Sequence, residues 1–353
     1  MDLKKILSNF GLSTDISPYG NGHINDTYCV SPTRYILQRI NTSIFTNPDG
    51  LMGNIENVTS FLREKIIKEG GNPDRETLTV IKTNDGKNYY QDETGCYRVY
   101  TFIENTVTIE DEKTEEVLYQ AGRGFGKFQK MLADFPAEKL FETIKDFHNT
   151  KKRVEALELA IKEDKAGRAA SVKEEIEFAL ENAKYAGIIV DGIEDGSIPL
   201  RVTHNDTKIN NILFDDKTLE PACVIDLDTV MPGSLLYDFG DALRMGASSA
   251  KEDEVNLDIT WFKTEIFEVF LKGFLSETKE SITEKEVSLL HFAPWIMTYE
   301  CGIRFLTDYL NGDVYFKIHR EHHNLDRTRN HFKLCKDIKA KENELKEIVK
   351  KYL

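Results

Sequence analysis

The hydrophobic pattern of this chain changes period once, near Glu104, and that change restricts the possible folds more than any other feature of the sequence. Before Glu104 the apolar residues form short runs rich in β-branched and aromatic side chains, which favour strands. After it they recur at the spacing of long helices. Strands followed by helices predict an α+β fold, with a small antiparallel sheet first and a larger, mainly helical part second. We therefore expect two lobes, residues 1–104 and residues 105–353.

The first lobe is expected to hold one helix among its strands. Asn47 can cap this helix, Pro48 suits its first turn, and Gly70-Gly71 can end it. Turn residues such as Asn84-Asp85-Gly86 separate the strand runs and predict hairpins. Five runs have strand composition, namely residues 27–30, 34–40, 77–81, 87–91 and 96–103.

In the second lobe the spacing predicts long helices over residues 112–135, 141–165 and 169–186. The glycines of residues 122–127 resemble a phosphate loop, but Ala121 and Phe128 stand where a Walker motif needs Gly and Ser or Thr. We interpret these glycines as positions that let two helices pack closely.

Composition excludes several classes of protein. The 353 residues include 60 acidic and 46 basic side chains, and the net charge of -14 argues against a nucleic-acid partner. Five cysteines lie far apart without a CxxC pair, which predicts a reducing, cytoplasmic location rather than a disulfide framework. The chain has neither an apolar run long enough to span a membrane nor a signal-peptide pattern, so we expect no membrane association.

The most informative segment reads HNDTKINN, residues 204–211, and a second apolar strand then ends at Asp226. Phosphoryl transfer from ATP needs a carboxylate beside the attacking hydroxyl, oxygen ligands for Mg²⁺ and a cation on the transferred phosphate. This segment supplies each type in order. We expect Asp206 to meet the acceptor hydroxyl, Lys208 to reach the γ-phosphate, and Asn211 with Asp226 to hold Mg²⁺.

A purely structural interpretation is available for each of these residues, because Asn and Asp also cap turns between strands. Their combination at this spacing favours a kinase. His204 is interpreted as a buried hydrogen-bonding strut for the loop. Asp238 begins the letters DFG of protein kinases, but it opens a helical pattern, so we expect it to cap N–H groups or brace the loop.

Several longer segments together resemble the aminoglycoside phosphotransferase and choline kinase superfamily, which shares the two-lobed protein-kinase fold. Within it the chain is most similar to the N-acetylhexosamine 1-kinases. The resemblance covers both lobes and rests on YGNGHINDTY (19–28), YILQRIN (35–41), NIENV (54–58), HNDTKINN (204–211), VIDLDTVMPGSLLYDFGD (224–241) and GIRFLTDYLNGDVYFK (302–317).

The resemblance implies a nucleotide site in the first lobe. Gly20, Asn21 and Gly22 correspond to the loop over the phosphates, and the segment Phe102, Ile103 and Glu104 corresponds to the hinge that binds adenine. The strand position that is Lys in protein kinases is Arg39 here, and Glu56 is its expected ion-pair partner. Arg is not a simple replacement for Lys, so this position departs from the kinase pattern.

The resemblance also implies an acceptor, which is N-acetylglucosamine or N-acetylgalactosamine phosphorylated at the anomeric hydroxyl. His23, Arg304 and Tyr315 would contact the sugar, with Asp206 and Asp228 as further contacts. A cationic acceptor would need carboxylates or an aromatic cage, and Arg304 argues against one. Two alternatives stay open: a kinase of another small alcohol such as a different sugar, homoserine or a choline-like compound, and a catalytically silent nucleotide-binding protein that acts through interactions.

Overall fold

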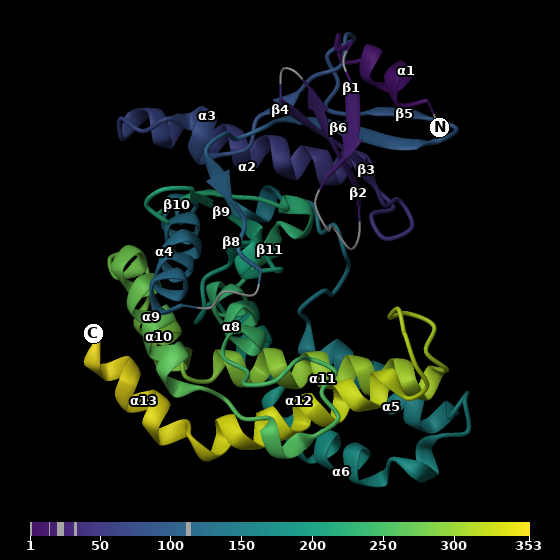
Figure 1. Cartoon of the computed structure of the whole chain (residues 1–353). Helices are drawn as coiled ribbons and strands as arrows, with labels where there is room; N and C mark the ends of the chain where they lie inside the picture. Colours follow the sequence, from purple (N-terminus) through teal and green to yellow (C-terminus); the bar gives the residue numbers. More distant parts are fainter. Residues whose placement is uncertain (1, 14, 20–24, 32–33, 111–113) are drawn as a thin grey trace.

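The computed structural model describes residues 2–13, 15–19, 25–31, 34–110 and 114–353 (Figure 1). Its N-terminal part is an antiparallel six-stranded sheet in the order β1-β2-β3-β6-β4, with β5 also paired to β6. The strands are β1 (Asp15–Pro18), β2 (Asp26–Ser31), β3 (Tyr35–Ile40), β4 (Val80–Ile81), β5 (Tyr90–Asp92) and β6 (Gly95–Thr101). The expected sheet is thus present, although β1 was not predicted and β4 keeps only two of its five expected residues.

Two helices cover the two faces of this sheet. On one face α2 (Pro48–Lys68) buries its apolar side chains against Ile40, Cys96 and Tyr100. On the other, α1 (Leu3–Ser8) packs against side chains that include Leu37 and Tyr97. The predicted start of α2 is confirmed, because the Asn47 side chain accepts the N–H of Gly50 and Pro48 is the first helical residue. A four-residue helix, α3 (Pro73–Glu76), follows α2.

The C-terminal part is mainly helical, as expected, and two small sheets lie in it below α2 in the view of Figure 1. One sheet joins β7 (Thr106–Val107), β9 (Ile212–Asp215) and β10 (Pro221–Val224), and the other joins β8 (Arg201–Thr203) and β11 (Met231–Gly233). The helices are α4 (Glu115–Met131), α5 (Thr150–Glu163), α6 (Lys173–Asn182), α7 (Gly187–Glu194), α8 (Leu235–Gly246), α9 (Thr264–Thr278), α10 (Glu284–Leu289), α11 (Ala293–Asn311), α12 (His323–Ala340) and α13 (Glu342–Lys351). None of the helices in the described ranges has the length and apolar character needed to cross a bilayer.

The expected helix over residues 141–165 is wrong in its first part, because α5 begins only at Thr150. Residues 141–149 instead form a loop that bonds to other parts of the chain. The Asn54 side chain accepts the N–H of Phe141 at 2.8 Å and donates to its carbonyl at 2.6 Å. These tertiary hydrogen bonds satisfy backbone groups that a helix would otherwise pair internally.

The glycines of residues 122–127 lie in α4 and let it approach α9 closely, as predicted. A Cβ atom on Gly122 would overlap the carbonyl oxygen of Phe270, and one on Gly126 would lie 2.7 Å from the carbonyl oxygen of Phe274. The contact is reciprocal, because a Cβ atom on Gly273 of α9 would overlap the carbonyl oxygen of Tyr119. Backbone therefore packs on backbone between these two helices.

We predict that Gly273→Ala lowers the free energy of unfolding by about 1–3 kcal/mol, because the added methyl group has no room and the helices must separate. Gly53→Ala is the matched control, since Gly53 also lies inside a helix but has open space where a Cβ would stand. That variant should keep or slightly raise stability. Denaturant unfolding of both proteins measures the difference, and equal stabilities would refute the close packing.

Candidate active site

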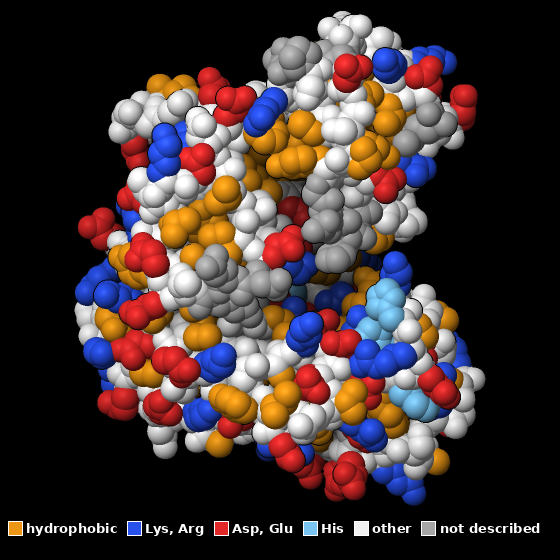
Figure 2. Space-filling model, in the orientation of Figure 1, with side chains coloured by type: hydrophobic (Ala, Val, Ile, Leu, Met, Phe, Trp, Pro, Cys, Tyr) orange, Lys and Arg blue, Asp and Glu red, His pale blue; other side chains and the backbone are white. Residues whose placement is uncertain are grey.

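The loop that carries Asp206 connects β8 to β9. Figure 2 shows a hollow between the N-terminal and C-terminal parts of the molecule. The structure brings the predicted residues of this loop together. The Nζ atom of Lys208 lies 2.8 Å from Oδ1 of Asp206, and Nδ2 of Asn211 donates to the Asp206 carbonyl at 2.8 Å. Asp206 keeps 22% of its side chain exposed, so its carboxylate is accessible from solvent.

The carboxylate of Asp238, in α8, binds the backbone of this loop. This carboxylate accepts the backbone N–H groups of His204 at 2.9 Å and Asn205 at 2.8 Å, and also the side-chain amide of Gln129 at 2.6 Å. Burial raises the pKa of Asp238, and the nearby His204 and these N–H donors oppose that shift. The expectation that Asp238 braces the loop is confirmed.

His204 acts as the predicted strut. It is fully buried, its Nε2 atom lies 2.8 Å from the Ile225 carbonyl, and its Nδ1 atom accepts the N–H of Asp206 at 3.3 Å. On the far side of the turn Asp241 accepts the N–H of Thr207 at 3.1 Å. Side chains from α8 and from the loop itself thus hold the backbone around Asp206, and the carboxylate of Asp206 is positioned before any substrate arrives.

His148 is a further support that the sequence did not indicate. It precedes α5, and its Nε2 atom lies 3.4 Å from the carbonyl of Asn205, a residue in the left-handed conformation with φ +64°. Its Nδ1 atom lies 2.8 Å from Oε1 of Glu300 in α11, and that buried carboxylate also accepts the hydroxyl of Thr150 at 2.6 Å. This contact links the helices of the C-terminal part to the loop that carries Asp206.

The carboxylates of Asp226, Asp228 and Asp206 form an acidic cluster beside the loop. Asp226 follows β10 in the left-handed conformation, with φ +59°. Burial, followed by the negative charges of Asp228 and Asp206, raises the pKa of Asp226 to about 6. Hard oxygen ligands that repel one another in this way suit a divalent cation, which would relieve the repulsion. Asp226 and Asn211, the predicted metal ligands, therefore fit a Mg²⁺ site.

Asp228 links the two parts of the chain. Its carboxylate pairs with the guanidinium group of Arg98 from β6 and accepts the side-chain amide of Asn25 at 2.7 Å. Both Arg98 and Asp228 are almost fully buried, and Asp228 raises the pKa of Arg98 although burial acts in the opposite direction. Both carboxylate oxygen atoms of Asp228 thus have partners from the N-terminal part. The sugar contact predicted for Asp228 stays a prediction.

The ion pair predicted between Arg39 and Glu56 is wrong. Glu56 pairs with Lys82 at 2.8 Å, whereas Arg39 is exposed, lies 3.6 Å from Asp26 and donates to the carbonyl of Thr94. The reason is the two-residue period of a strand, which places Arg39 on the face covered by α1 together with Leu37.

Arg98 is the arginine of the sheet that pairs with the acidic cluster, and the sequence predictions did not include it. It lies opposite Gln38 of β3, whose Oε1 atom accepts its Nη2 at 2.8 Å. A charged residue within the apolar run of residues 96–103 was the available signal. Because a buried arginine needs a counter-ion, that signal indicates a partner carboxylate elsewhere in the chain.

The segment Phe102, Ile103 and Glu104 joins the main sheet to β7, as a hinge would. The Ile103 side chain is buried, the Phe102 ring packs edge-on against Tyr19 at 5.8 Å, and Glu104 lies 3.8 Å from Arg34. Gly20, Asn21, Gly22 and His23 lie outside the described residues. The roles of these residues toward nucleotide and sugar stay predictions.

Arg304 and Tyr315 both contact the ring of Phe316. The guanidinium of Arg304, on α11, lies between the rings of Phe147 and Phe316, at 5.3 and 5.5 Å from their centroids. Tyr315 is 65% exposed, and its ring contacts Phe316 edge-on. Arg304 is thus held by aromatic faces, and its N–H edges can donate to a ligand carbonyl or hydroxyl.

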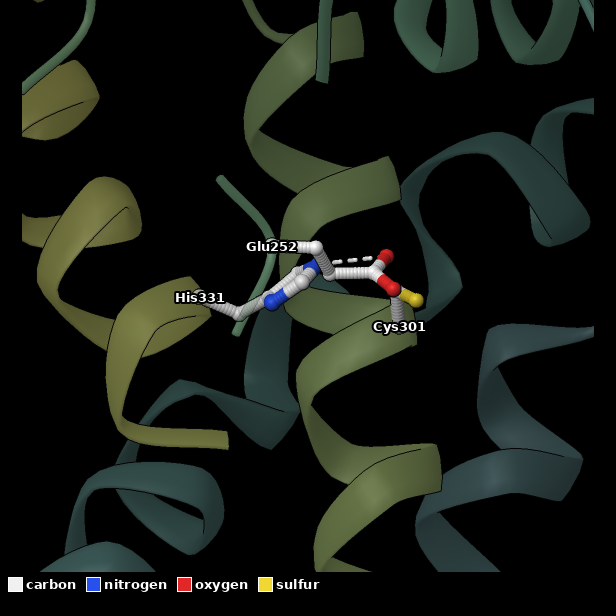
Figure 3. Close-up of side chains that lie close together, drawn as sticks. All are labelled: Glu252, Cys301 and His331. Atoms are coloured by element: carbon white, nitrogen blue, oxygen red, sulfur yellow. Dashed lines mark ion pairs between the residues drawn. The ribbon is translucent and has the colours of Figure 1, made fainter. Parts of the chain in front are cut away.

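A second cluster with potential metal ligands consists of Glu252, Cys301 and His331 (Figure 3). Arg244 lies against this cluster. Its Nη1 atom is 2.9 Å from Oε1 of Glu252 and 3.1 Å from Nε2 of His331. Burial, assisted by Arg244, lowers the pKa of His331 to about 4, and burial raises that of Cys301 to about 11. Arg244 thus places a positive charge beside the three potential ligands, which disfavours a metal cation at this cluster.

Comparison with known proteins agrees with this geometry. The model of the phosphotransferase enzyme family APH matches residues 15–260. An aminoglycoside phosphotransferase from Alicyclobacillus acidocaldarius has a TM-score of 0.65 at 13% identity, over 98% of this chain and 96% of its own. A microcompartment-associated aminopropanol kinase has a TM-score of 0.60 at 14% identity, over 98% of both chains. The ternary complex of streptomycin, ATP and APH(2'')-IIa has a TM-score of 0.54 at 13% identity, over 95% and 96%.

The chain belongs to the APH phosphotransferase enzyme family. Its fold is the two-part α+β fold that the structural neighbours share, with the antiparallel sheet first and the helical part second. The superfamily inferred from the sequence segments is therefore confirmed.

The acidic cluster generates a pH prediction for the metal-free protein in EDTA. The folded state binds a proton at Asp226 more tightly than the unfolded chain, so stability falls as the pH rises from about 4 to about 6 and stays reduced above that range. Asp226→Asn removes the repelling charge. We expect this variant to melt at a higher temperature than the wild type at pH 7.5, and the difference to shrink toward pH 4.5.

Asp216→Asn, which neutralises an exposed aspartate in the turn after β9, serves as the control and should leave the melting temperature unchanged. Thermal melting of the three proteins across this pH range measures the effect. A lower melting temperature for Asp226→Asn at pH 7.5 would show that the carboxylates do not repel one another.

Proposed function

We propose that the protein is an ATP- and Mg²⁺-dependent N-acetylhexosamine 1-kinase. The observation that carries the kinase part is the convergence of Asp206, Lys208, Asn211 and Asp226 at the cleft in a chain of the APH family. The acceptor rests on the resemblance of its sequence segments to the N-acetylhexosamine 1-kinases. The acceptor is thus a small molecule, as for the aminopropanol kinase among the structural neighbours.

Asp206 is proposed to accept the proton of the anomeric hydroxyl as that oxygen attacks the γ-phosphate of ATP. The ammonium group of Lys208 pairs with the carboxylate of Asp206. Burial acts to lower the pKa of Lys208, but the charge and hydrogen bond of Asp206 outweigh burial and raise it. The ammonium group therefore stays charged and can neutralise the transferred phosphate. Asn211 and Asp226 would hold Mg²⁺, which supplies charge neutralisation on the phosphates.

The nucleotide is proposed to bind at the hinge of Phe102, Ile103 and Glu104, with Gly20, Asn21 and Gly22 over its phosphates. We assign Arg98, and not Arg39, as the arginine at the base of this nucleotide site. By pairing with Asp228, it neutralises one of the three clustered carboxylates and leaves Asp226 for the metal. Arg98 thus lowers the negative charge that an incoming triphosphate meets.

The acceptor site is proposed to lie between Asp206 and Arg304. An arginine held between two aromatic rings suits the amide carbonyl and hydroxyl groups of an N-acetylated sugar, and it disfavours a cationic acceptor. Tyr315 and His23 would add contacts to the sugar.

The identity of the acceptor is tested by incubating the protein with ATP, Mg²⁺ and a panel of N-acetylglucosamine, N-acetylgalactosamine, glucose, choline, homoserine and aminopropanol. We expect N-acetylhexosamine 1-phosphate as the main product, identified by phosphorus NMR. Phosphate at C6 would refute the anomeric position. Turnover of choline, homoserine or aminopropanol alone would refute the sugar, and turnover of none would favour the silent nucleotide-binding alternative.

Asp206→Asn should lower kcat about 10²- to 10⁴-fold and leave the ATP affinity nearly unchanged, because the carboxylate acts on the acceptor hydroxyl. Steady-state kinetics and nucleotide titration measure the two quantities. Asp216→Asn again provides a surface control and should keep wild-type turnover. If Asp206→Asn also keeps it, the assigned base is incorrect.

A further inference from the structure

A buried carboxylate in α11 organises the turn that carries Tyr315. Asp308 accepts three consecutive backbone N–H groups, those of Val314 at 2.9 Å, Tyr315 at 2.8 Å and Phe316 at 2.9 Å. Its Oδ2 atom also accepts the side-chain amide of Asn324 at 2.9 Å. Asp308 is only 4% exposed, so these four donors replace the water that would otherwise solvate the charge.

The surrounding contacts give this turn one conformation. The helix ends at Gly312, which has φ +96°, and Asp313 follows at φ +60°. Asp313 pairs with Arg168 at 2.5 Å and accepts the Asn324 side chain at 2.9 Å. The chain therefore leaves α11 and folds back over the carboxylate of Asp308.

The turn carries two aromatic residues, the half-buried Phe316 and the exposed Tyr315. Phe316 packs on Phe305 with a centroid distance of 4.5 Å and lies 5.5 Å from the guanidinium of Arg304. Tyr315 is 65% exposed. Arg304 lies one helical turn before Asp308, so a single stretch of α11 holds the arginine, its aromatic cover and the exposed tyrosine in a fixed relation.

We propose that Asp308 is a positioning residue for the acceptor: by binding the N–H groups of residues 314–316 it fixes Tyr315 and the Phe316 ring that orients Arg304. Asp308 acts through these residues and does not touch the acceptor. The inference rests on the proposed function in assigning the Arg304 side of the cleft to the acceptor. The hydrogen bonds that define the turn do not depend on which acceptor binds.

Asp308→Asn tests the proposal with little change in shape. The amide has one acceptor oxygen in place of two and brings an NH₂ group against the donors of the turn, so at least one backbone N–H loses its partner. We expect the KM of the acceptor to rise about tenfold, with kcat changed less than about twofold and the KM of ATP unchanged. Hydrogen exchange of the amides of residues 314–316 should accelerate in the same variant.

Gly312→Ala is the second variant, for the case that Asp308→Asn does not fold. It changes the same turn without removing the buried carboxylate. Its φ of +96° is unfavourable for a side chain, although a Cβ there would meet open space. The expected change is a smaller rise in acceptor KM.

Glu286→Gln is the control for general destabilisation. Glu286 is a fully buried carboxylate that pairs with Arg201 and caps α10. The Glu286→Gln substitution should lower the melting temperature and leave the KM of ATP and the KM of the acceptor unchanged.

An unchanged acceptor KM in Asp308→Asn, with accelerated exchange at residues 314–316, would overturn the proposal. Equal changes in the KM values of ATP and acceptor would also overturn it, because they indicate a structural role only. If the wild type phosphorylates another alcohol of the panel, the sugar assignment fails, and the same kinetics with that alcohol still test Asp308. A rise in its KM alone would support the positioning role.

Discussion

The loop that carries Asp206 depends on one interaction above all, the hydrogen bonds that the buried carboxylate of Asp238 accepts from it. This carboxylate binds two successive N–H groups of the loop before Asp206, and its burial makes those hydrogen bonds expensive to lose. His204, Asp241 and His148 bind further polar groups of the loop. The half-buried Asp206 is therefore held from several sides by other parts of the chain.

Charge organises the rest of the site. Three aspartates lie close enough for their charges to raise the pKa of Asp226, and two cations of the described chain balance them from different directions. Arg98 reaches Asp228 from the N-terminal sheet, and Lys208 reaches Asp206 from the loop itself. Under the proposed function, Asp226 with Asn211 would be the place where a divalent cation gains most. The same Arg98–Asp228 pair connects the two parts of the molecule.

Features that depend on short-range chemistry could be predicted from the sequence. Asn47-Pro48 marks the start of α2 because a side-chain oxygen and a fixed φ favour a first helical turn wherever the chain runs. The glycines of residues 122–127 predicted close helix packing. The order of HNDTKINN and the strand before Asp226 predicted the loop that carries Asp206, but it did not predict the side chains that hold this loop. Local patterns could not show that residues 141–149 leave the helix, because Asn54, far away in the sequence, binds Phe141.

The sequence by itself determined the order of strands and helices, the family, and the residue types of the catalytic loop, because each of these depends on neighbours within a few positions. Only the tertiary structure decided which charges meet. Arg39 and Arg98 are both arginines on strands, but the alternation of the sheet directs one to the α1 face and the other to Asp228. Likewise Glu56 meets Lys82, and His148 meets Glu300. Ion pairs between distant segments depend on strand register and helix packing, which a local pattern does not specify.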